Sequence, residues 1–407
     1  GKGYLVAGSH WAHSHADTRQ SVIYDRVVAN RVHSDGSDNG YRSKVWRYDN
    51  PDQAPVLVQS IVQNGMNRDW KYFFTDGKHY LASICDQTVE KNGHVASIVY
   101  QFDTVTGTFM EDQRLPITFA GSVEVIQFDG RTFLAAGRIW NYLEKKNSLI
   151  LERCPVSGIF MHFQSINSWW ASDFHTFDLN GIKYLALGNR YCDNDAASTT
   201  LNHAALMACL TLFKFDLQTD QFVEFQRFGL VGSKKLEIRD VEYAHVEGSD
   251  FLFLACGGSY TVANSKIYKR NINTGFFELH QSLFDSSPQD FESWSIGRRH
   301  YLMLVNHNEN CLLRDNDKEI FSGETCYKVA NFLYEYDSNS DKYVAVQKLE
   351  TNRGFAVKHY SIDGHHYVAS AGFDQYFVAV YKLGYFAPQA APLTARGGEI
   401  SIASSRL

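Results

Sequence analysis

Apolar and polar residues alternate along most of the chain in short runs, a pattern that predicts paired β-strands. Residues 69–84 read DWKYFFTDGKHYLASI, two alternating runs separated by Asp76-Gly77. An Asp-Gly pair between two such runs is a strong signal for a hairpin with a two-residue turn. The hairpin pattern returns, closely or loosely, at residues 122–136, 173–187, 240–254, 290–304 and 355–370. Its recurrence indicates one repetitive architecture and not a string of unrelated domains.

Two further runs follow each hairpin and complete the repeating unit. After a segment of variable length comes a third run that ends in aromatic-x-aromatic-Asp, as in residues 98–103 (IVYQFD) and 212–216 (LFKFD). A fourth run follows, as in residues 222–226 (FVEFQ). The unit of four strands recurs every 50 to 67 residues, which is typical of a propeller blade.

The amino terminus begins partway through a unit. Residues 4–7 (YLVA) match a second strand, whereas the missing first-strand pattern is found at the other end, in residues 397–402 (GGEISI). Second-strand patterns number seven, at residues 4, 80, 133, 184, 251, 301 and 367. We therefore predict an all-β, single-domain fold for residues 1–407: a seven-bladed β-propeller of four-stranded antiparallel blades. Residues 1–62 and 385–407 would share the last blade, in which one carboxy-terminal strand closes the three amino-terminal strands.

The repeat resembles a known family. Residues 69–82 read Asp-Trp-x-x-Phe-x-x-Asp-Gly-x-x-Tyr-Leu-Ala, residues 265–268 read Ser-x-Ile-Tyr, and residues 222–226 read Phe-x-x-x-Gln. This pattern is similar to the EAR repeat, also called the epitempin or EPTP repeat, which forms the seven-bladed propeller domain of the leucine-rich glioma-inactivated proteins. The resemblance covers essentially the whole chain, and we expect a propeller that stands alone, without partner domains. It implies an extracellular recognition module and names no ligand.

The charge and the apolar runs exclude two classes of partner. The 407 residues carry a formal net charge of −6, so the sequence has no electrostatic footprint for nucleic acid or for an acidic membrane surface. No run reaches the 18 apolar residues expected of a membrane-spanning helix. The chain begins at Gly1 without Met and reads as strand from residue 4, which fits a processed chain. We therefore expect a secreted, extracellular protein.

The segments between the second and third strands differ most between repeats, and a four-stranded meander places all of them on one face. We expect this face to bind an extracellular protein or a small ligand, because loops on a rigid scaffold commonly carry function. One alternative is a lectin-like site that stacks glycans on aromatic rings; another is that long loops are merely tolerated there. The candidate contact residues are His10, Trp11, Trp140, Tyr142, Tyr191 and Tyr260.

Catalysis has thin support in the sequence. It contains no nucleophile elbow, no Gly-rich phosphate loop and no HExxH helix. A propeller hydrolase with paired carboxylates as acid and base is the remaining enzymatic interpretation. Three histidines in or near first strands, His175, His245 and His359, could face the central channel, although strand histidines are more often packed or capping residues.

An acidic residue recurs at the start of the first strand, at Asp69, Asp173, Asp240 and Asp290. Four carboxylates around the channel mouth would repel one another unless a cation or hydrogen-bond donors neutralise them. Oxygen ligands suit Ca²⁺, and the resemblance is consistent with it, since propellers of the family can hold a cation in the channel. The alternative is that each Asp caps backbone amides in its own blade-to-blade turn.

A second candidate metal site lies near the amino terminus, in the stretch HWAHSHAD at residues 10–17. His13 and His15 alternate with small residues and would point the same way in an extended segment. Together with Asp17 they could ligate Zn²⁺ or Cu²⁺. The alternative is a solvated loop that contributes to the binding face.

The seven cysteines sort by segment. Cys192 and Cys209 bracket one long second-to-third-strand segment, and Cys311 and Cys326 bracket another. A disulfide in each pair would stabilise the fold by on the order of 3 kcal/mol and would indicate an oxidising compartment; the alternative is free buried thiols. The sequence leaves the pairing of the other three open: Cys85, Cys154 and Cys256.

Overall fold

The computed structural model describes the strands, their short turns and some of the connections between them. The described residues are 3–7, 23–24, 27–28, 41–48, 56–63, 65–88, 97–139, 147–168, 170–190, 209–228, 237–257, 265–283, 285, 288–306, 313–315, 318–320, 329–351, 354–362, 364–372, 378–383 and 402–406. Every regular element in these ranges is a β-strand, and no helix in them is long and apolar enough to cross a membrane.

The strands form six four-stranded antiparallel sheets, one three-stranded sheet and two small hairpins. The three-stranded sheet comprises β1 (Gly3–Ala7), β4 (Tyr41–Tyr48) and β5 (Val56–Gln63). The four-stranded sheets are β6 (Gly65–Thr75), β7 (Lys78–Thr88), β8 (Ser97–Asp103), β9 (Thr108–Leu115); β10 (Ala120–Phe128), β11 (Arg131–Arg138), β12 (Ser148–Arg153), β13 (Phe160–Ile166); β14 (Ala171–Leu179), β15 (Ile182–Asn189), β16 (Leu210–Asp216), β17 (Gln221–Phe228); β18 (Glu237–Val246), β19 (Ser249–Gly257), β20 (Ser265–Arg270), β21 (Phe277–Leu283); β22 (Pro288–Ile296), β23 (Arg299–Asn306), β26 (Val329–Asp337), β27 (Lys342–Thr351); and β28 (Gly354–Ile362), β29 (His365–Gly372), β30 (Val378–Leu383), β31 (Ile402–Arg406). The hairpins are β2 (Ile23–Tyr24) with β3 (Val27–Val28) and β24 (Leu313–Asp315) with β25 (Lys318–Ile320).

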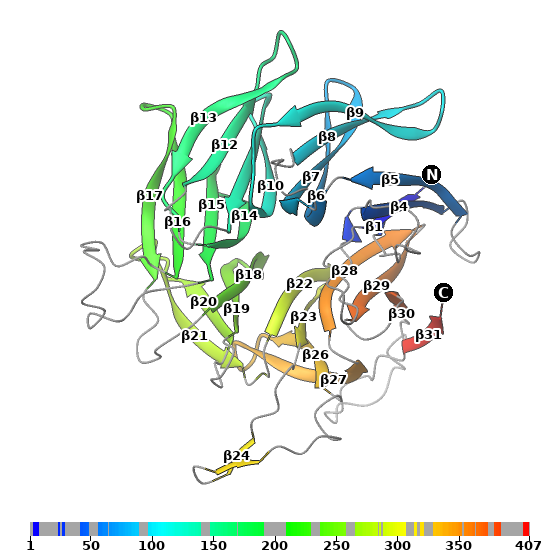
Figure 1. Cartoon of the computed structure of the whole chain (residues 1–407). Helices are drawn as coiled ribbons and strands as arrows, with labels where there is room; N and C mark the ends of the chain where they lie inside the picture. The colour runs from blue at the N-terminus through cyan, green and yellow to red at the C-terminus, as the bar shows by residue number, and fades with distance from the viewer. Residues whose placement is uncertain are drawn as a thin grey trace.

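The sheets are arranged around a common centre, as in a propeller (Figure 1). Each four-stranded sheet contributes one inner strand, and successive inner strands are in contact in the order β6, β10, β14, β18, β22 and β28. The predicted hairpin is therefore the innermost pair of strands in each of these sheets. The all-β, four-stranded architecture predicted from the sequence is confirmed.

The two-residue turns of these hairpins have the backbone conformation that their residues favour. Asp76 and Gly77 have φ values of 50° and 70°, and Asn180 and Gly181 have 52° and 76°. Positive φ at both central positions is characteristic of a type I′ turn, in which Asn, Asp and Gly are least strained. Local sequence thus determines where the first strand ends and the second begins.

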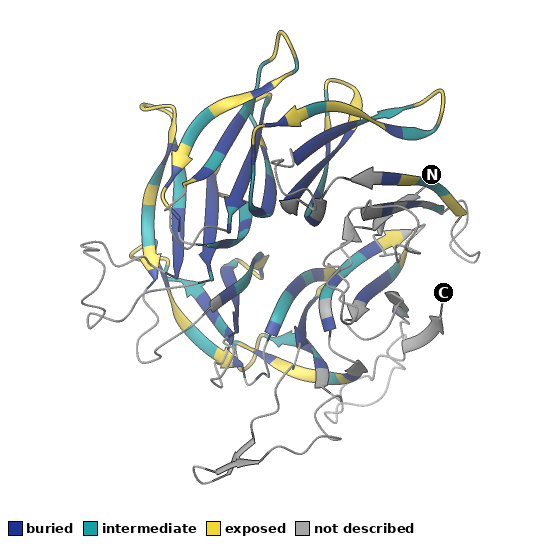
Figure 2. Cartoon of the chain, in the orientation of Figure 1, coloured by how far each residue is buried: buried dark blue, intermediate teal, exposed yellow. Residues whose placement is uncertain are grey.

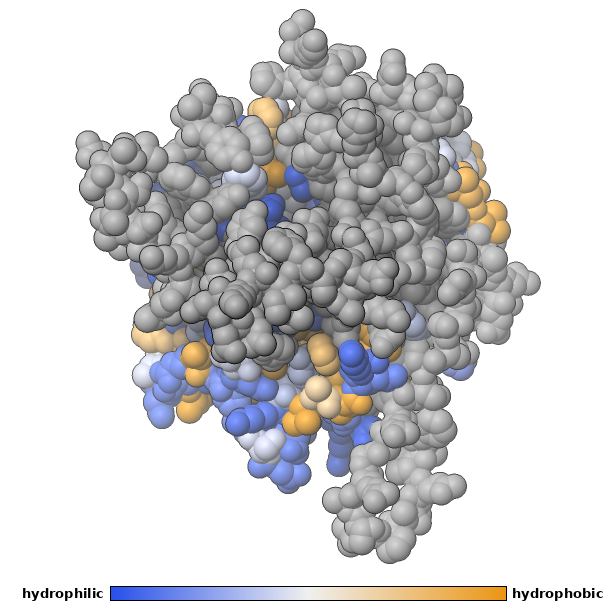
Figure 3. Space-filling view, turned by 60° about the horizontal axis from the view of Figure 1, so that its bottom comes forward, coloured by the Kyte–Doolittle hydropathy of each residue, from blue (hydrophilic) through white to orange (hydrophobic). Residues whose placement is uncertain are grey.

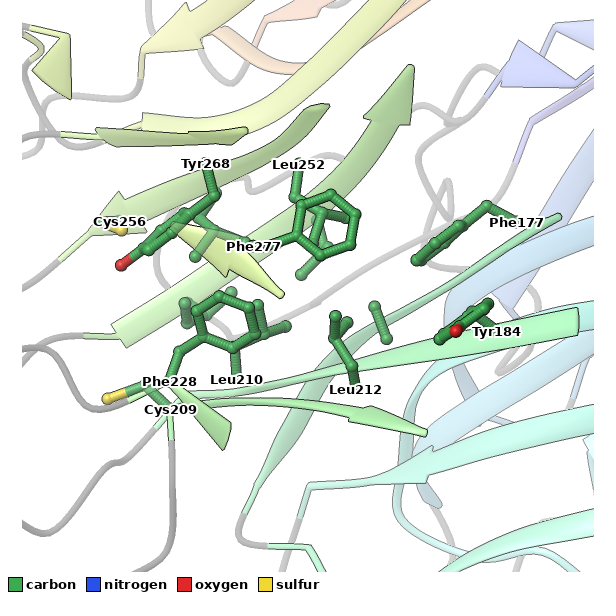
Figure 4. Packing of buried hydrophobic residues seen from close by; sticks show 14 of the residues in the cluster. Phe177, Tyr184, Cys209, Leu210, Leu212, Phe228, Leu252, Cys256, Tyr268 and Phe277 are labelled. Atoms are coloured by element: carbon green, nitrogen blue, oxygen red, sulfur yellow. The ribbon is translucent and has the colours of Figure 1, made fainter. Parts of the chain in front are cut away.

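The core lies between neighbouring sheets. Second strands such as β11 and β19 are buried on both faces along most of their length, whereas outer strands such as β9 and β13 have several exposed positions (Figure 2). Figure 4 shows one cluster between the β14–β17 and β18–β21 sheets. In it, the rings of Phe177 and Tyr243 stack with centroids 4.3 Å apart. Cys256 belongs to this cluster and Cys85 is buried elsewhere, so both occupy the core.

Glutamines tie the outer strands of neighbouring sheets together. On β17, the Gln226 amide donates from Nε2 to the Phe277 carbonyl (2.8 Å) and accepts from the Phe277 N–H at Oε1 (2.9 Å). We call this two-bond arrangement a glutamine clasp, since the side chain binds both backbone groups of one residue on the next outer strand. Five pairs form it: Gln59–Phe109, Gln113–Phe160, Gln164–Phe222, Gln226–Phe277 and Gln281–Tyr343.

The described carboxy-terminal strand belongs to the last four-stranded sheet, whereas residues 397–401 of the predicted closing segment lie outside the described residues. β31 pairs antiparallel with β30, with Leu383 opposite Ile402, and so forms the outer strand of the last sheet. The sheet that contains β1 has three described strands, and the predicted closure of that sheet by a carboxy-terminal strand is not confirmed. The physical reason is that an alternating pattern identifies a strand but not the edge with which its backbone pairs.

Candidate functional site

The four predicted aspartates lie at equivalent places on inner strands. Each accepts a hydrogen bond from a backbone N–H of the next sheet's inner strand, and the two residues are more than 50 positions apart in the chain. The capping alternative therefore describes their observed contacts, with the difference that the amide belongs to the next sheet and not to the residue's own turn. The donor–acceptor pairs are Val123 N–Asp69 (2.9 Å), Val241 N–Asp173 (3.0 Å), Phe291 N–Asp240 (2.9 Å) and Val357 N–Asp290 (2.6 Å).

A second set of polar residues lies two positions beyond the aspartates on β6, β14, β18 and β22, and at the equivalent positions of β10 and β28. We call this set the inner ring: Lys71, Glu124, His175, Glu242, Glu292 and Lys358. Its members associate in pairs across sheet boundaries. The nitrogen–oxygen distances are 2.8 Å for Lys71–Glu124, 3.5 Å for His175–Glu242 and 2.6 Å for Lys358–Glu292.

Burial sets the protonation of several of these groups. Burial, together with the nearby Glu242 carboxylate, raises the pKa of Asp240 to about 7. Burial also raises the pKa of Glu292 to about 7, against the opposing effect of the Lys358 ammonium. Burial lowers the pKa of His175 to about 4, so its imidazole is neutral at pH 7 beside Glu242. The centre of the sheets is thus an acidic, poorly solvated region in which carboxyl groups hold protons near neutral pH.

The same physical effect raises the pKa values of Asp173 and Asp290 well above the ordinary range. For both residues burial is the largest cause, followed by repulsion from Asp240. Among the described residues, no group of three or more His, Cys, Asp or Glu side chains is arranged to hold a metal ion. The contacts that the aspartates make are hydrogen bonds to amides, and calcium in the channel stays a prediction.

The sequence contains a signal for the inner ring besides the recurring aspartates. The residue two positions after each aspartate is titratable in every case, as in Asp69–Lys71 and Asp240–Glu242. Within the ring, only His175 is among the residues that the sequence predicted could face the channel.

The other two predicted histidines lie outside the inner ring. His359 packs against Trp294 with ring centroids 5.0 Å apart, and its Nε2 lies 2.9 Å from Nδ1 of His366. His245 lies on the turn side of its strand, where its Nδ1 is 2.7 Å from Asp250. Both histidines therefore contact neighbouring side chains, as expected if strand histidines are packed or capping residues and not channel-facing groups.

The predicted contact and amino-terminal metal residues lie outside the described residues, as do three of the four bracketing cysteines. Cys209 is described, and it is buried and disulfide-bonded. Cys192 as its partner stays a prediction. The residues outside the described ranges are His10, Trp11, His13, His15, Asp17, Trp140, Tyr142, Tyr191, Cys192, Tyr260, Cys311 and Cys326.

The described surface offers no substitute for these residues as a contact site. In Figure 3 hydrophilic and hydrophobic residues are interspersed on the visible described surface. Four of the most exposed apolar side chains, Val105, Val156, Leu217 and Ile272, are in turns between third and fourth strands of four different sheets. Single exposed apolar residues are ordinary on a folded protein. They therefore do not define a binding site.

One buried carboxyl outside the ring gives a pH prediction. Asp285 is 4% exposed, accepts a 2.5 Å hydrogen bond from the Ser265 N–H, and has a pKa raised to about 7 by burial. Because the folded pKa lies above the unfolded value, this group makes the fold progressively less stable as pH rises from about 4 to 7. We expect Asp285→Asn to reduce that loss in denaturant titrations across the same interval. Asp337→Asn is the control, since hydrogen bonds in its exposed turn lower the pKa of Asp337 and give the opposite slope.

Taken together, the sheets and their inner strands define an all-β protein of the propeller type. No family model matches the chain. The mouse thrombospondin-type laminin G domain and EAR repeat-containing protein is 24% identical over 370 residues, which are 86% of this chain and 51% of that protein. Its human counterpart is 24% identical over 286 residues, 69% of this chain and 39% of the relative. The chain is thus related to the EAR repeat proteins, and it spans about half the length, or less, of these relatives.

A solved structure supports the architecture. The periplasmic gluconolactonase of Pseudomonas aeruginosa superposes with a TM-score of 0.58 at 12% sequence identity, over 100% of this chain and 95% of that chain. Similarity at this level of identity concerns the fold alone, because one fold hosts many unrelated chemistries.

Proposed function

We propose that the protein is an extracellular binding protein that recognises a protein or small ligand through one face of a seven-bladed propeller. The observation that carries the proposal is the unequal length of its connections. First and second strands are joined by two residues, as between β6 and β7, whereas second and third strands are separated by residues 190–209 between β15 and β16 and by residues 307–328 between β23 and β26. All the second-to-third connections leave the sheets at the same face, because every sheet is the same meander.

Three further points support this proposal. The four-stranded sheets and the three-stranded sheet lie around a common centre, which is consistent with a propeller. The disulfide at Cys209 is typical of an oxidising, extracellular compartment. The relatives are named for EAR repeats and a laminin G domain, which is consistent with a recognition role.

The experiment is a screen of the purified chain against an array of extracellular protein domains and a glycan array. Each hit is then measured with two variants. In the first, residues 258–264 of the second-to-third connection are replaced by Gly and Ser; in the second, Asn180→Asp alters a two-residue turn on the opposite face.

We expect the first variant to weaken binding at least about tenfold, the loss of roughly 1.4 kcal/mol of contact energy, and the second to leave binding unchanged. A hit that depends on the turn variant and not on the loop variant would place the ligand on the wrong face and contradict the proposal. Hits confined to the glycan array would favour the lectin-like alternative.

A further inference from the structure

Three arginines lie at the face where the second-to-third connections leave the sheets. Arg138 is the last residue of β11, and Arg190 directly follows the last residue of β15. Arg239 on β18 lies beside the end of β19, because a Cβ atom added to Gly257 would be 3.2 Å from its Cγ. All three arginines are half-buried, and we call them the arginine arc. Although exposed apolar residues define no site on the described surface, the arc places three positive charges at the base of these connections.

Close contacts between neighbouring sheets make the arc continuous. A Cβ atom on Gly137, which precedes Arg138, would lie 3.0 Å from Cβ of Ala171, so the end of β11 touches the start of β14. A Cβ atom on Gly188 would likewise lie 2.7 Å from Cγ2 of Ile238, so the end of β15 touches the start of β18. The three arginines therefore belong to one stretch of the face that crosses three successive sheets.

An aromatic residue accompanies two of the arginines. Phe119 and Trp170, in the chain segments that lead into β10 and β14, are half-buried and have φ values of 56° and 55°. Their carbonyls accept hydrogen bonds from the N–H groups of Ile139 (2.8 Å) and Arg190 (2.9 Å). A bulky residue in the left-handed region is a conformational outlier, and such outliers cluster at ligand sites. The two aromatic residues thus single out the same part of the face as the arginines.

Two of the guanidinium groups have defined surroundings. Arg138 donates from Nε to the Thr118 carbonyl and from Nη2 to Thr118 Oγ1, both at 3.3 Å. The guanidinium carbon of Arg190 lies 5.6 Å from the centroid of the Trp170 ring, within the range of a cation–π contact. Side chains that are positioned in advance lose less conformational freedom when a partner binds.

The chemistry of these residues selects the partner. Arginine presents a planar fork of donors that matches a carboxylate, and Trp and Arg are enriched at the energetic centres of protein interfaces. The chain as a whole carries a formal net charge of −6, which opposes the diffuse attraction that a long polyanion needs. Because salt screens charges that are more than about 8 Å apart, a short acidic segment senses mainly the arginines that it touches.

We infer that the arginine arc binds a short acidic segment of an extracellular protein, whose Asp and Glu carboxylates pair with Arg138, Arg190 and Arg239. Apolar side chains of the same segment pack against Phe119 and Trp170. This inference rests on the proposed function, because it names the partner chemistry of the same face.

An array of random-sequence peptides, probed with the full chain, tests the inference. We expect the bound peptides to be enriched in Asp and Glu over the array average. For the strongest of them, Arg138→Gln/Arg190→Gln should weaken binding at least about tenfold, since each lost hydrogen bond to a charged group costs roughly that factor. Arg298→Gln is the matched control, because it removes an exposed arginine from a two-residue turn on the opposite face and should leave the affinity unchanged.

A second double variant guards against loss of folding. Arg138→Lys/Arg190→Lys keeps both charges but lacks the planar forks, so its affinity for acidic peptides should fall between those of the wild type and the glutamine variant. Thermal unfolding of both variants reports whether the fold is retained. Equal losses of affinity in two folded variants would show that the positive charge is not what the peptides recognise, and would contradict the inference.

Three further results would overturn the inference. They are bound peptides without enrichment in Asp and Glu, an enrichment that survives Arg138→Gln/Arg190→Gln, and arginine-dependent binding of a heparin oligosaccharide in place of acidic peptides. Failure of the proposed function is distinguishable from these results. If protein-domain hits depend on residues 258–264 and not on the arginines, the binding face stands and the arc does not. If no domain binds through residues 258–264, the proposed function itself fails.

Discussion

Lys358→Met is expected to lower the free energy of unfolding by about 3 kcal/mol at pH 8. The Lys358 ammonium lies 2.6 Å from the Glu292 carboxylate, whose side chain is 6% exposed. Removing the cation leaves a buried carboxylate that must remain unpaired or take up a proton. Because protonation costs less in acid, the destabilisation should shrink at pH 5. Guanidinium titrations at both pH values measure the difference.

Two variants separate this ion pair from general effects of substitution. Adding Glu292→Gln to Lys358→Met removes the stranded charge while keeping an acceptor for the His359 N–H, so most of the stability should return. Arg114→Met breaks an exposed pair with Glu111 and should cost less than about 1 kcal/mol. If Lys358→Met were equally costly in the wild-type and Glu292→Gln backgrounds, the ion pair would not be the cause.

Gln226→Ala is expected to destabilise the protein by about 2 kcal/mol, because unsatisfied buried backbone groups cost about 1–3 kcal/mol each before relaxation and water entry reduce the loss. The substitution removes both hydrogen bonds of one clasp and leaves the N–H and C=O of Phe277, which is 2% exposed, without their partner. Thermal and guanidinium unfolding both report the change.

The clasp offers a graded control for this prediction. Near pH 7 an ionised Glu in Gln226→Glu keeps an acceptor for the Phe277 N–H and has no donor for the Phe277 carbonyl, so this variant should fall between the wild type and Gln226→Ala. Protonation at low pH supplies an O–H donor and should bring its stability closer to that of the wild type. Gln221→Ala, at an exposed position of the same strand, should leave stability unchanged within about 0.5 kcal/mol. If Gln221→Ala were as harmful as Gln226→Ala, strand propensity and not the clasp would explain the effect.

The predicted hairpins and the observed ones agree because their determinants are local. An Asp-Gly or Asn-Gly pair favours positive φ at both turn positions, and the alternation on either side determines which side chains face the neighbouring sheet. Trp70, for example, is adjacent to Lys71 of the inner ring, so the two side chains point to opposite faces of the strand. The Trp70 side chain is fully buried. The all-β class and the four-stranded unit therefore followed from the pattern alone.

The partner of each aspartate could not be predicted in the same way. The sequence showed an aspartate at a fixed place in several repeats, for example Asp240. That pattern was compatible both with a cation site and with a cap on backbone amides. The donor to Asp240, the Phe291 N–H, lies 51 positions away on the next inner strand. That contact exists only because consecutive sheets pack with their inner strands side by side. The same reason explains why the inner ring was missed as a paired network.

By itself the sequence determined the strands, their turns, the repeat and the relationship to EAR repeat proteins, since each depends on residues close together in the chain or on their periodicity. Only the tertiary structure decided which backbone amides the aspartates bind, which lysine neutralises which glutamate, and which strand edge β31 pairs with. These contacts join residues of different sheets or distant strands. Backbone pairing and burial at such contacts depend on how all the sheets pack around their common centre and not on any local pattern.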